Sequence, residues 1–363
     1  MKKILLITRP IAPPWDEASK NFAYTLAKNI SDAEIGLFTY EIINDLPSNV
    51  HQKAIYTSPK FTYFQKIRLI KHLRKFREDY DIFHYIFTPT RQNSFLIKNF
   101  VNHKNSRAKT IQTVATLRED LYRDTDFKKI LFADLIIAYS DYAKNKLNSL
   151  GFNNVKRVYP GIDLDEYKKT ENDPTKSDFV INFTGEYTRL GAIDLIIDSF
   201  IEIIKTIPEA RLSLAVRIKN SQDARKKEEV VEKLKNNNLL EKVTFFDDGS
   251  YKMSEVYNLC DISLFPVTDM KGKFDIPLAV VEAMASEKPV ILSDLPILSE
   301  LSNGRNSVII ERGNMKQLIE AILDLYHHPE KRSLIGLEAR KFVEERFDIR
   351  KIAEKYQEIY EKL

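Results

Sequence analysis

The chain has 363 residues, of which 43% are hydrophobic and 30% charged, and its formal net charge is +4 at pH 7. This composition is typical of a soluble globular protein, and the length suffices for two domains. The longest apolar runs have the length of a strand, which argues against a membrane-spanning protein. A single cysteine excludes an internal disulfide and indicates a reducing, cytoplasmic setting.

The charge is distributed unevenly along the chain. Residues 1–170 carry 28 Lys/Arg against 18 Asp/Glu, whereas the remainder carries 28 against 34. The densest basic stretch is residues 64–77, where apolar residues recur every three positions. This pattern predicts an amphipathic helix with a cationic face. That face is either an ordinary solvated surface or a contact to anionic lipid headgroups, peripheral on the inner face of a membrane. Nucleic acid ranks below both, because no recognition module accompanies the charge.

Short apolar runs alternate with longer helical patterns from the start of the chain. The first run directly follows Met1-Lys2-Lys3, so we expect a first strand there and no signal peptide. The alternation predicts a doubly wound parallel sheet. Its expected strands are Lys3–Thr8, Glu34–Phe38, Ile82–Phe87, Lys109–Val114, Leu135–Ala138 and Lys156–Val158. Expected helices include Ser19–Ile30 and Asp141–Leu150, the latter closed by Gly151.

A polar stretch over residues 168–178 is the best linker candidate, and the alternation restarts after it. The second set of expected strands is Phe179–Thr184, Arg211–Val216, Val243–Phe245, Ile262–Phe265, Pro289–Ser293 and Ser307–Ile310. Helical patterns between them include Ala192–Lys205, Ser254–Leu259 and Pro277–Ser286. We therefore expect an α/β protein with two similar domains that face a cleft, since ligands of such sheets bind beyond the carboxyl ends of the strands.

Several kinds of catalytic site find no support in the sequence. No G-x-G-x-x-G follows the first strand, and with 10 glycines the chain lacks the phosphate loops of dinucleotide enzymes and P-loop NTPases. The six histidines are scattered without metal-ligand spacing. Asp163-Leu164-Asp165 follows Pro160-Gly161, so we interpret it as a turn and not as a metal-binding D-x-D. No G-x-S-x-G nucleophile elbow is present either.

The segment from Cys260 to Asp294 is the most informative one. Its predicted helix is apolar on nearly every side and carries Glu282 in its middle, a position that is costly for a carboxylate unless something binds it. Asp275 precedes Pro277, which suits an N-cap followed by proline, and lies seven residues before Glu282, on the same helix face. The helix N-terminus could bind a diphosphate, and Glu282 could accept hydrogen bonds from ribose hydroxyls.

On these residues the chain resembles the retaining glycosyltransferases of family 4, which have the two-domain GT-B fold. That family shows an E-x7-E motif in a segment similar to residues 274–291, FDIPLAVVEAMASEKPVI. The resemblance covers nearly the whole chain. Its other matches are Asp81–His84, Ala133–Ser140, Tyr159–Asp163, Tyr257–Pro266 and Arg346–Tyr360.

The resemblance implies a domain plan and a reaction. Residues 1–168 would form a Rossmann-like acceptor domain and residues 169–340 a Rossmann-like donor domain, with 341–363 a C-terminal helix packing back toward the first. The donor would be a nucleoside-diphosphate sugar and the acceptor a carbohydrate, a lipid-linked molecule or a small molecule. Transfer would retain the anomeric configuration. It would need no metal cofactor, because cationic side chains would neutralise the departing diphosphate.

The resemblance also implies site residues. Glu282 would bind the ribose, and the backbone at Ile276, Pro277 and Leu278 would meet the sugar and the phosphates. The other expected donor-side residues are Gly185, Arg189, Arg217, Lys219 and Phe246. The expected catalytic residues are Asp275 and His84, and the expected acceptor-side residues are Asp16, Glu17, Lys20 and Arg118.

The chain departs from the family pattern at several of these positions. Phe274 stands where the first glutamate is expected, so Asp275 is either its substitute or only an N-cap. Glu186 stands at the arginine of the phosphate loop and the loop lysine is absent, which leaves Arg189 as the replacement. Arg217 and Lys219 either assist it or are solvated loop charges, and His84 is either an acceptor contact or a core histidine.

Two other functions remain open at this stage. One is a catalytically degenerate subunit that binds a nucleotide sugar, which the altered phosphate loop suggests. The other is a nucleotide-sugar epimerase on the same fold, for which the acid and base residues are sparse.

Overall fold

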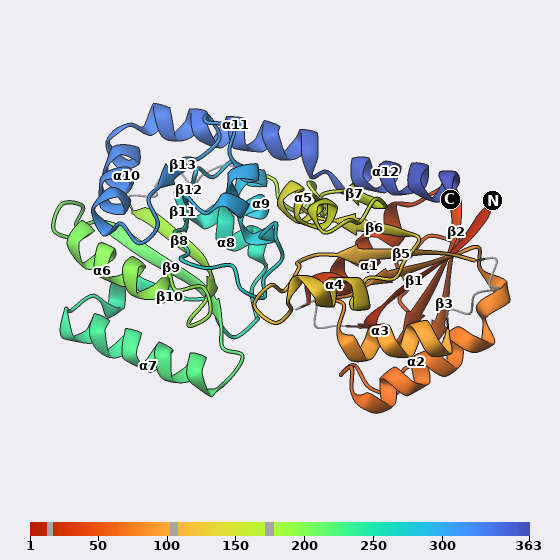
Figure 1. The fold of residues 1–363 in the computed structure, drawn as a ribbon. Helices are drawn as coiled ribbons and strands as arrows, with labels where there is room; N and C mark the ends of the chain where they lie inside the picture. The colour runs from red at the N-terminus through yellow and green to blue at the C-terminus, as the bar shows by residue number, and fades with distance from the viewer. Residues whose placement is uncertain (13–16, 102–107, 171–177) are drawn as a thin grey trace. The chain divides into compact units, whose positions relative to one another are not determined.

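The computed structural model describes residues 1–12, 17–101, 108–170 and 178–363. They divide into two compact units, one formed by residues 1–162 with 347–363 and the other by residues 163–346. Each unit is a parallel β-sheet flanked by helices (Figure 1).

The sheet of the first unit has the strand order β3-β2-β1-β4-β5-β6-β7 in the described residues, and all of its pairings are parallel. The strands are β1 Lys2–Ile11, β2 Ala33–Thr39, β3 Val50–Ala54, β4 Ile82–Ile86, β5 Lys109–Val114, β6 Leu135–Ala138 and β7 Val155–Arg157. The helices are α1 Ala18–Asn29, α2 Tyr63–Lys75, α3 Arg91–Phe100, α4 Asp124–Ile130, α5 Asp141–Ser149 and α12 Ile349–Lys362, with a 3-10 turn at Arg77–Asp79.

Helices cover both faces of this sheet. On one face, Leu69 and Leu73 of α2 pack with Leu5, Phe83 and other core residues of the strands. On the other face α1 and the C-terminal helix α12 lie together, and the ring of Phe22 in α1 is 5.8 Å from that of Tyr356 in α12. The first unit is therefore completed by the last helix of the chain.

The sheet of the second unit has the order β10-β9-β8-β11-β12-β13 in the described residues, again all parallel. The strands are β8 Phe179–Glu186, β9 Ala210–Arg217, β10 Val243–Phe245, β11 Ile262–Phe265, β12 Val290–Ser293 and β13 Val308–Ile310. The helices are α6 Ile193–Ile203, α7 Ser221–Asn236, α8 Met253–Leu259, α9 Leu278–Ala285, α10 Met315–His327 and α11 Pro329–Arg346, with 3-10 turns at Leu240–Lys242 and Pro296–Leu301.

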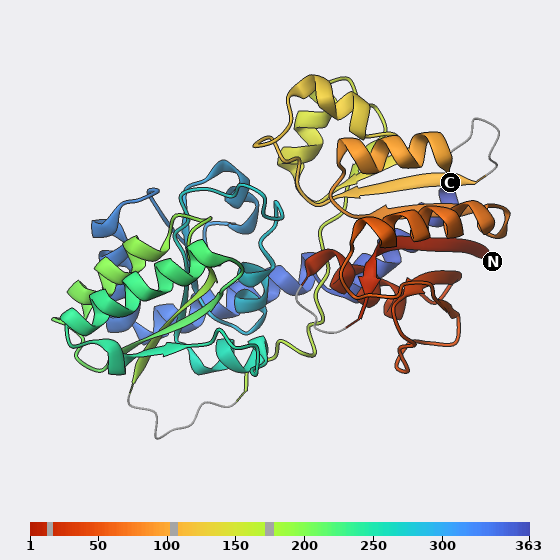
Figure 2. The same cartoon turned by 90° about the horizontal axis from the view of Figure 1, so that it is seen from below.

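Two groups of helices flank this second sheet. Helix α6 contacts α7 and α10, while α9 contacts α8 and α11 (Figures 1 and 2). The central strands read as continuous apolar runs because helices bury both faces. The chain winds outward from β8 to β10 and then returns to β11 on the other side of β8. This reversal makes the carboxyl ends of β8 and β11 the switch point where ligands of such sheets bind.

The predicted elements agree with this fold, with one omission and small shifts at the ends. Strand β3 was not predicted, because its sequence Val-His-Gln-Lys-Ala at the sheet edge is largely polar. Cys260 is buried, and its Sγ lies 3.1 Å from the carbonyl oxygen of Tyr257. In the parts of the chain that the structure describes, no helix combines the length and apolar character that a membrane span requires.

Candidate functional site

Three neighbouring strands of the second unit deliver polar residues to one edge of the sheet. Strand β8 ends at Glu186 and β9 ends at Arg217, and the loop that leaves β11 runs to α9. Because the strands are parallel, their carboxyl ends lie at the same edge, at the switch point between β8 and β11.

At this edge a buried glutamate holds three cations. The Oε1 atom of Glu186 lies 2.7 Å from Nζ of Lys219 and 2.8 Å from Nζ of Lys273, and Nε of Arg189 donates to Oε2 at 2.6 Å. The Glu186 side chain is 5% exposed, whereas those of the three cations are 26–41% exposed. The group as a whole therefore keeps excess positive charge, and that charge faces outward.

The electrostatics of Glu186 follow from these contacts. Burial by itself favours the neutral acid, but the hydrogen bond from Arg189 and the charges of Lys273 and Lys219 bring its pKa down to about 2. Burial also lowers the pKa of Lys273, against the opposing effect of Glu186. The carboxylate thus helps to keep this lysine charged.

The loops that carry the cations are fixed to one another. The backbone N–H of Lys219 and the hydroxyl of Thr188 both donate to Asp223 of α7, at 3.2 and 2.8 Å. Arg189 also donates to the carbonyl oxygen of Gly272, at 3.2 Å. Gly191 has a positive φ, and a Cβ atom there would lie 2.1 Å from Oγ1 of Thr268. These contacts hold the three cations in a defined arrangement.

Glu282 lies in α9, whose apolar residues bury the helix in the second unit. Tyr257 of α8 donates its hydroxyl to Oε2 of Glu282 at 3.1 Å, and the hydroxyl of Tyr167 also hydrogen-bonds this carboxyl. Tyr257 also hydrogen-bonds Thr184, two residues before Glu186, so Glu282 lies close to the end of β8. Burial raises the pKa of Glu282 to about 7, against the hydrogen bond from Tyr257, which lowers it.

The start of α9 differs from the prediction. The helix begins at Leu278 with Pro277 as its N-cap, and no side chain of the described residues caps it. Asp275 is buried but lies before the helix, so neither the N-cap prediction nor its placement on one helix face with Glu282 is correct. The reason is that the chain at Pro277 is still extended and α9 starts only after the proline. The uncapped first turn has N–H groups without intrahelical partners, which suits an anion.

Residues 178–328 match the family model of glycosyl transferases group 1. This part of the chain is a group 1 glycosyltransferase domain. It contains the cation cluster at β8 and β9, the uncapped start of α9 and Glu282.

The relatives of the glycosyltransferase domain agree with this assignment. An uncharacterized glycosyltransferase of Methanocaldococcus jannaschii is 21% identical over 67% of this chain and 62% of its own length. The capsular polysaccharide biosynthesis glycosyltransferase CapM of Staphylococcus aureus is 27% identical over 62% of this chain and 58% of its own length. The chain thus matches about three fifths of each relative.

The fold as a whole is GT-B, with two Rossmann-like units. The crystal structure of Anabaena HepE in complex with UDP and glucose aligns over 100% of both chains, with a TM-score of 0.75 and 18% sequence identity. The two parallel sheets found here account for this likeness.

Other predicted residues of the glycosyltransferase domain lie at the same sheet edge or in β8 itself. Arg217 is exposed at the end of β9 and contributes to the electrostatics of Glu282. Phe246 follows β10 and packs against Tyr251, with ring centroids 5.1 Å apart. Gly185 lies within β8, where a Cβ atom would meet the ring of Phe183 at 2.4 Å, so the glycine makes room for that ring. Ile276 and Pro277 are buried, and Leu278 is partly exposed.

The predicted acceptor-side residues belong to the first unit. Glu17 caps α1 by accepting the backbone N–H of Lys20 at 3.0 Å, and the buried Nζ of Lys20 donates to the carbonyl oxygen of Ala12 at 3.0 Å. Arg118 has a positive φ and forms two 2.8 Å hydrogen bonds to Asp120. Asp16 lies outside the described residues.

His84 lies inside the first unit. Its side chain is 0% exposed, Nδ1 lies 2.7 Å from the hydroxyl of Tyr360, and Nε2 lies 2.7 Å from that of Thr113. Burial lowers its pKa to about 3. These contacts engage both ring nitrogens and favour the alternative of a core histidine, so the catalytic prediction for His84 is not carried further.

Sequence reasoning missed the partners of the two glutamates. Lys273, Tyr257 and Tyr167 were not among the predicted site residues, although Lys273 lies within the segment judged most informative. Only the lysine carried a usable signal, as a cation two residues before Asp275. In the described part of the chain, no group of three or more His, Cys, Asp or Glu residues could hold a metal ion.

Proposed function

We propose that the protein is a retaining glycosyltransferase of family 4 that moves a hexose from a nucleoside-diphosphate sugar to an acceptor hydroxyl. The observation that carries this proposal is the outward-facing cation cluster at the switch point, with Glu282 close by. A diphosphate requires such positive charge, and a carboxylate accepts hydrogen bonds from ribose hydroxyls. The retaining outcome rests on the family resemblance.

The proposed reaction needs stabilisation of the leaving diphosphate. Arg189, Lys219 and Lys273 supply positive charge where the negative charge of the leaving group grows, and the first-turn amides of α9 add hydrogen-bond donors. Asp275 is proposed to contact hydroxyls of the donor sugar. Because the cations take the place of a metal ion, we expect EDTA to leave the transfer rate within about twofold of its original value.

Uridine nucleotides are the first donors to test, because the HepE structures hold UDP, UDP with glucose, and UDP-glucose. Calorimetric titration with UDP, GDP and ADP would compare the wild type with Glu282→Ala and with Glu320→Ala, an exposed glutamate of α10 as matched control. We expect Glu282→Ala to weaken nucleotide binding about tenfold or more, because a hydrogen bond to a charged group is lost. Equal affinity of both variants would exclude the ribose role of Glu282.

The altered phosphate loop favours a second candidate function, a catalytically degenerate subunit that only binds the nucleotide sugar. Glu186 cancels one of the three cationic charges that would otherwise face the diphosphate. A mass-spectrometric screen with a panel of sugar nucleotides separates the candidates. A glycosylated acceptor or hydrolysed donor supports the transferase, an epimerised nucleotide sugar supports the epimerase, and binding without turnover supports the subunit.

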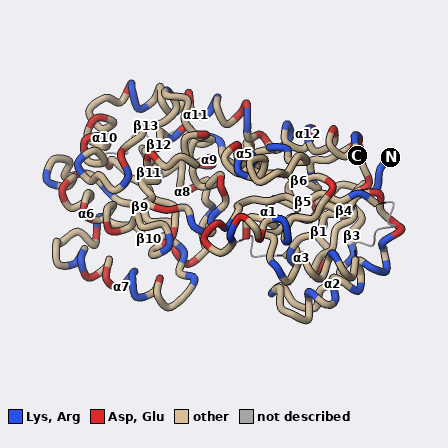
Figure 3. Tube along the Cα trace, in the orientation of Figure 1, with Lys and Arg blue, Asp and Glu red and all other residues tan. Residues whose placement is uncertain are grey.

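We propose further that the protein is cytoplasmic and that the exposed side of α2 attaches it to an anionic membrane. No acidic residue occurs in residues 60–77, and the blue segments of α2 mark its lysines and arginines (Figure 3). Phe64 and Ile67 are 79% and 49% exposed, and Lys71 and Arg74 lie exposed further along the helix. Apolar and cationic groups on one exposed helix suit the boundary between headgroups and acyl chains.

Vesicle sedimentation tests this attachment. We expect binding to phosphatidylglycerol-containing vesicles and not to pure phosphatidylcholine, with losses in Lys71→Glu/Arg74→Glu and in Phe64→Ser/Ile67→Ser. A control double variant of α7, Lys233→Glu/Lys235→Glu, should bind like the wild type. Equal sedimentation of all four proteins would rule out α2 as the attachment site.

A further inference from the structure

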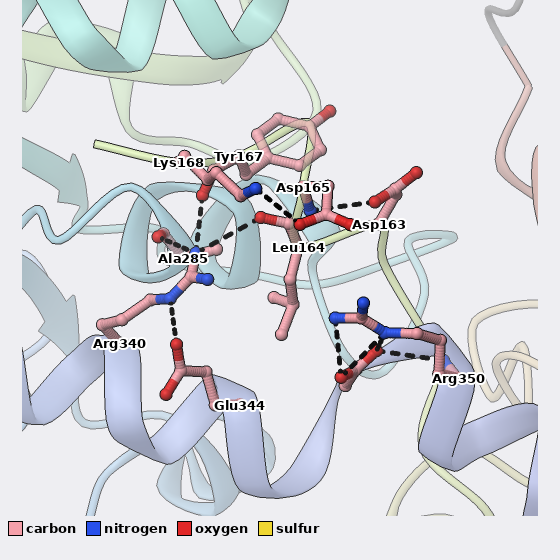
Figure 4. A network of polar contacts seen from close by, with 10 residues as sticks. Asp163, Leu164, Asp165, Tyr167, Lys168, Ala285, Arg340, Glu344 and Arg350 are labelled. Atoms are coloured by element: carbon pink, nitrogen blue, oxygen red, sulfur yellow. Dashed lines mark hydrogen bonds and ion pairs between the residues drawn. The ribbon is translucent and has the colours of Figure 1, made fainter. Parts of the chain in front are cut away.

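An arginine of α11 joins two segments next to Glu282. Nη1 of Arg340 lies 2.7 Å from the carbonyl oxygen of Ala285 and 2.8 Å from that of Tyr167, with Leu164 O at 3.5 Å (Figure 4). Glu344, one turn later on the same helix, accepts from Nε of Arg340 at 2.6 Å. The arginine side chain is 16% exposed, so these contacts are largely shielded from water.

The chemistry of these acceptors suits arginine. Ala285 is the last residue of α9, so its carbonyl oxygen has no intrahelical donor and lies at the negative end of the helix dipole. The carbonyl of Tyr167 comes from a different segment. A planar guanidinium with several fixed donors can satisfy both oxygens and keep its pair with Glu344, whereas an ammonium group has no such fixed geometry.

The segment that carries Tyr167 has no regular secondary structure of its own. It forms a turn in which the backbone N–H of Asp165 donates to Asp163 at 2.9 Å, as predicted for these residues, and Lys168 pairs with Asp165 at 2.7 Å. Asn258 of α8 donates to the carbonyl oxygen of Lys168 at 2.9 Å. The position of this turn therefore depends on side chains from α8 and α11.

The turn and α8 each bring one phenol to Glu282. Tyr167 reaches the carboxyl from the turn, and Tyr257 reaches it from α8 at 3.1 Å. Arg340 fixes the backbone of Tyr167 against the residue three positions after Glu282 in the chain.

We infer that Arg340 is a positioning residue of the proposed nucleotide site, which acts by holding the hydroxyl of Tyr167 against the carboxyl of Glu282. The inference rests on the proposed function, because it assigns the two phenols the task of orienting a carboxylate for the ribose. A carboxylate whose remaining acceptor positions are oriented in advance loses less freedom when the ligand binds.

The charged and titratable groups that act on Glu282 come from three places. Tyr257 comes from α8, Tyr167 and Glu166 from the turn, and Arg217 from the end of β9. Hydrogen bonds from the phenols favour the ionised carboxylate, whereas Glu166 favours the neutral acid. Loss of the Tyr167 hydroxyl therefore moves the titration of Glu282 to higher pH. Loss of Arg340 does the same if the arginine acts through Tyr167.

The experiment compares Arg340→Met, Tyr167→Phe and the double variant with wild type. The matched control is Arg332→Met, an arginine of α11 that donates to the carbonyl oxygen of Leu325 instead. The Glu282 carboxyl is followed by carbon-13 NMR in ligand-free protein, its resonance assigned by its loss in Glu282→Gln. We expect the same upward shift of the titration midpoint in Arg340→Met, Tyr167→Phe and the double variant, and none in the control.

Nucleotide affinity is measured on the same proteins. We expect Kd to rise roughly threefold to tenfold in both single variants and no further in the double variant, because both changes remove the same hydrogen bond. Arg340→Lys, which retains the charge and a donor, should recover part of the affinity. If Arg340→Met does not fold, Arg340→Lys and Tyr167→Phe carry the comparison.

The two readouts distinguish the inference from the proposed function. An unchanged Glu282 titration in the arginine variants overturns the inference, and so do independent, additive effects of Arg340→Met and Tyr167→Phe on Kd. If the titration shifts as expected but no nucleotide binds to the wild type, the positioning role stands and the proposed function fails.

Discussion

Glu186 is the residue at which the chain departs most from its family, and the structure shows what surrounds it. A carboxylate replaces the arginine of the phosphate loop, and cations from the loops after β8, β9 and β11 gather around it. The positive charge of the site therefore comes from three loops. Sequence alone pointed to Arg189 and Lys219, but Lys273 is 84 residues from Arg189 in the chain, and no local pattern connects them.

At this scale we predict that Glu186→Gln destabilises the second unit at neutral pH. The pKa of Glu186 is about 2 in the folded protein against a model value of 4.5, so its stabilising effect is present above pH 4.5 and is lost as pH falls toward 2. The pKa difference corresponds to roughly 3 kcal/mol at pH 7. Urea unfolding should give a lower midpoint for the variant at pH 7 and a smaller difference at pH 3.

A surface pair serves as control for that measurement. Glu202→Gln removes an exposed partner of Lys205 on α6, and pairs of this kind contribute at most about 1 kcal/mol. A Glu186→Gln midpoint as close to wild type as that of the control would contradict the role of Glu186 in holding the cations.

At the scale of elements, the direction of a helix face could not be read from spacing alone. In α2 the apolar residues recur every three positions, which suggested one docked row, but the helix buries Gln65, Leu69 and Leu73 and exposes Phe64 and Ile67. A spacing of three rotates each successive residue by about 60° around a helix of 3.6 residues per turn, so such a row cannot stay on one face. The buried residues follow the spacing of four.

Helix α11 contacts the end of α9 through a glycine. A Cβ atom at Gly336 would lie 2.2 Å from the carbonyl oxygen of Glu287, which is backbone and cannot turn aside. We predict that Gly336→Ala lowers the thermal midpoint of the second unit, because overpacking costs about 1–3 kcal/mol while the gain in helix propensity is at most about 1 kcal/mol. Leu337→Ala, at an exposed neighbouring position, should change the midpoint much less. A Gly336→Ala protein as stable as wild type would show that α11 can shift without loss.

At the scale of the whole molecule, the first unit is built from two distant parts of the chain. Residues 347–363 pack with residues 1–162, and Tyr360 of α12 bonds His84 in β4. The N-terminal sheet therefore depends on the last residues to be synthesised.

We predict that Tyr360→Ala increases hydrogen exchange in β4 and β5 and leaves β8 and β9 unchanged, because it removes a buried ring and the partner of Nδ1 of His84. Tyr326→Ala gives the reverse control, since Tyr326 of α10 packs on Phe179 of β8, 5.2 Å between ring centroids. Mass spectrometry of peptides from both units measures the two patterns. Increased exchange in both sheets for either variant would mean that the units do not respond separately.

The sequence by itself determined the alternation of strands and helices, the two parallel sheets and the glutamate of α9, because these depend on periodicity and on a short contiguous segment. Only the tertiary structure decided which side chains meet. It placed His84 in the core, moved Asp275 outside the helix, gathered the cations around Glu186 and brought Tyr167 and Tyr257 to Glu282. Such contacts join residues far apart in the chain, so they arise from the packing of strand ends and loops, which local spacing does not encode.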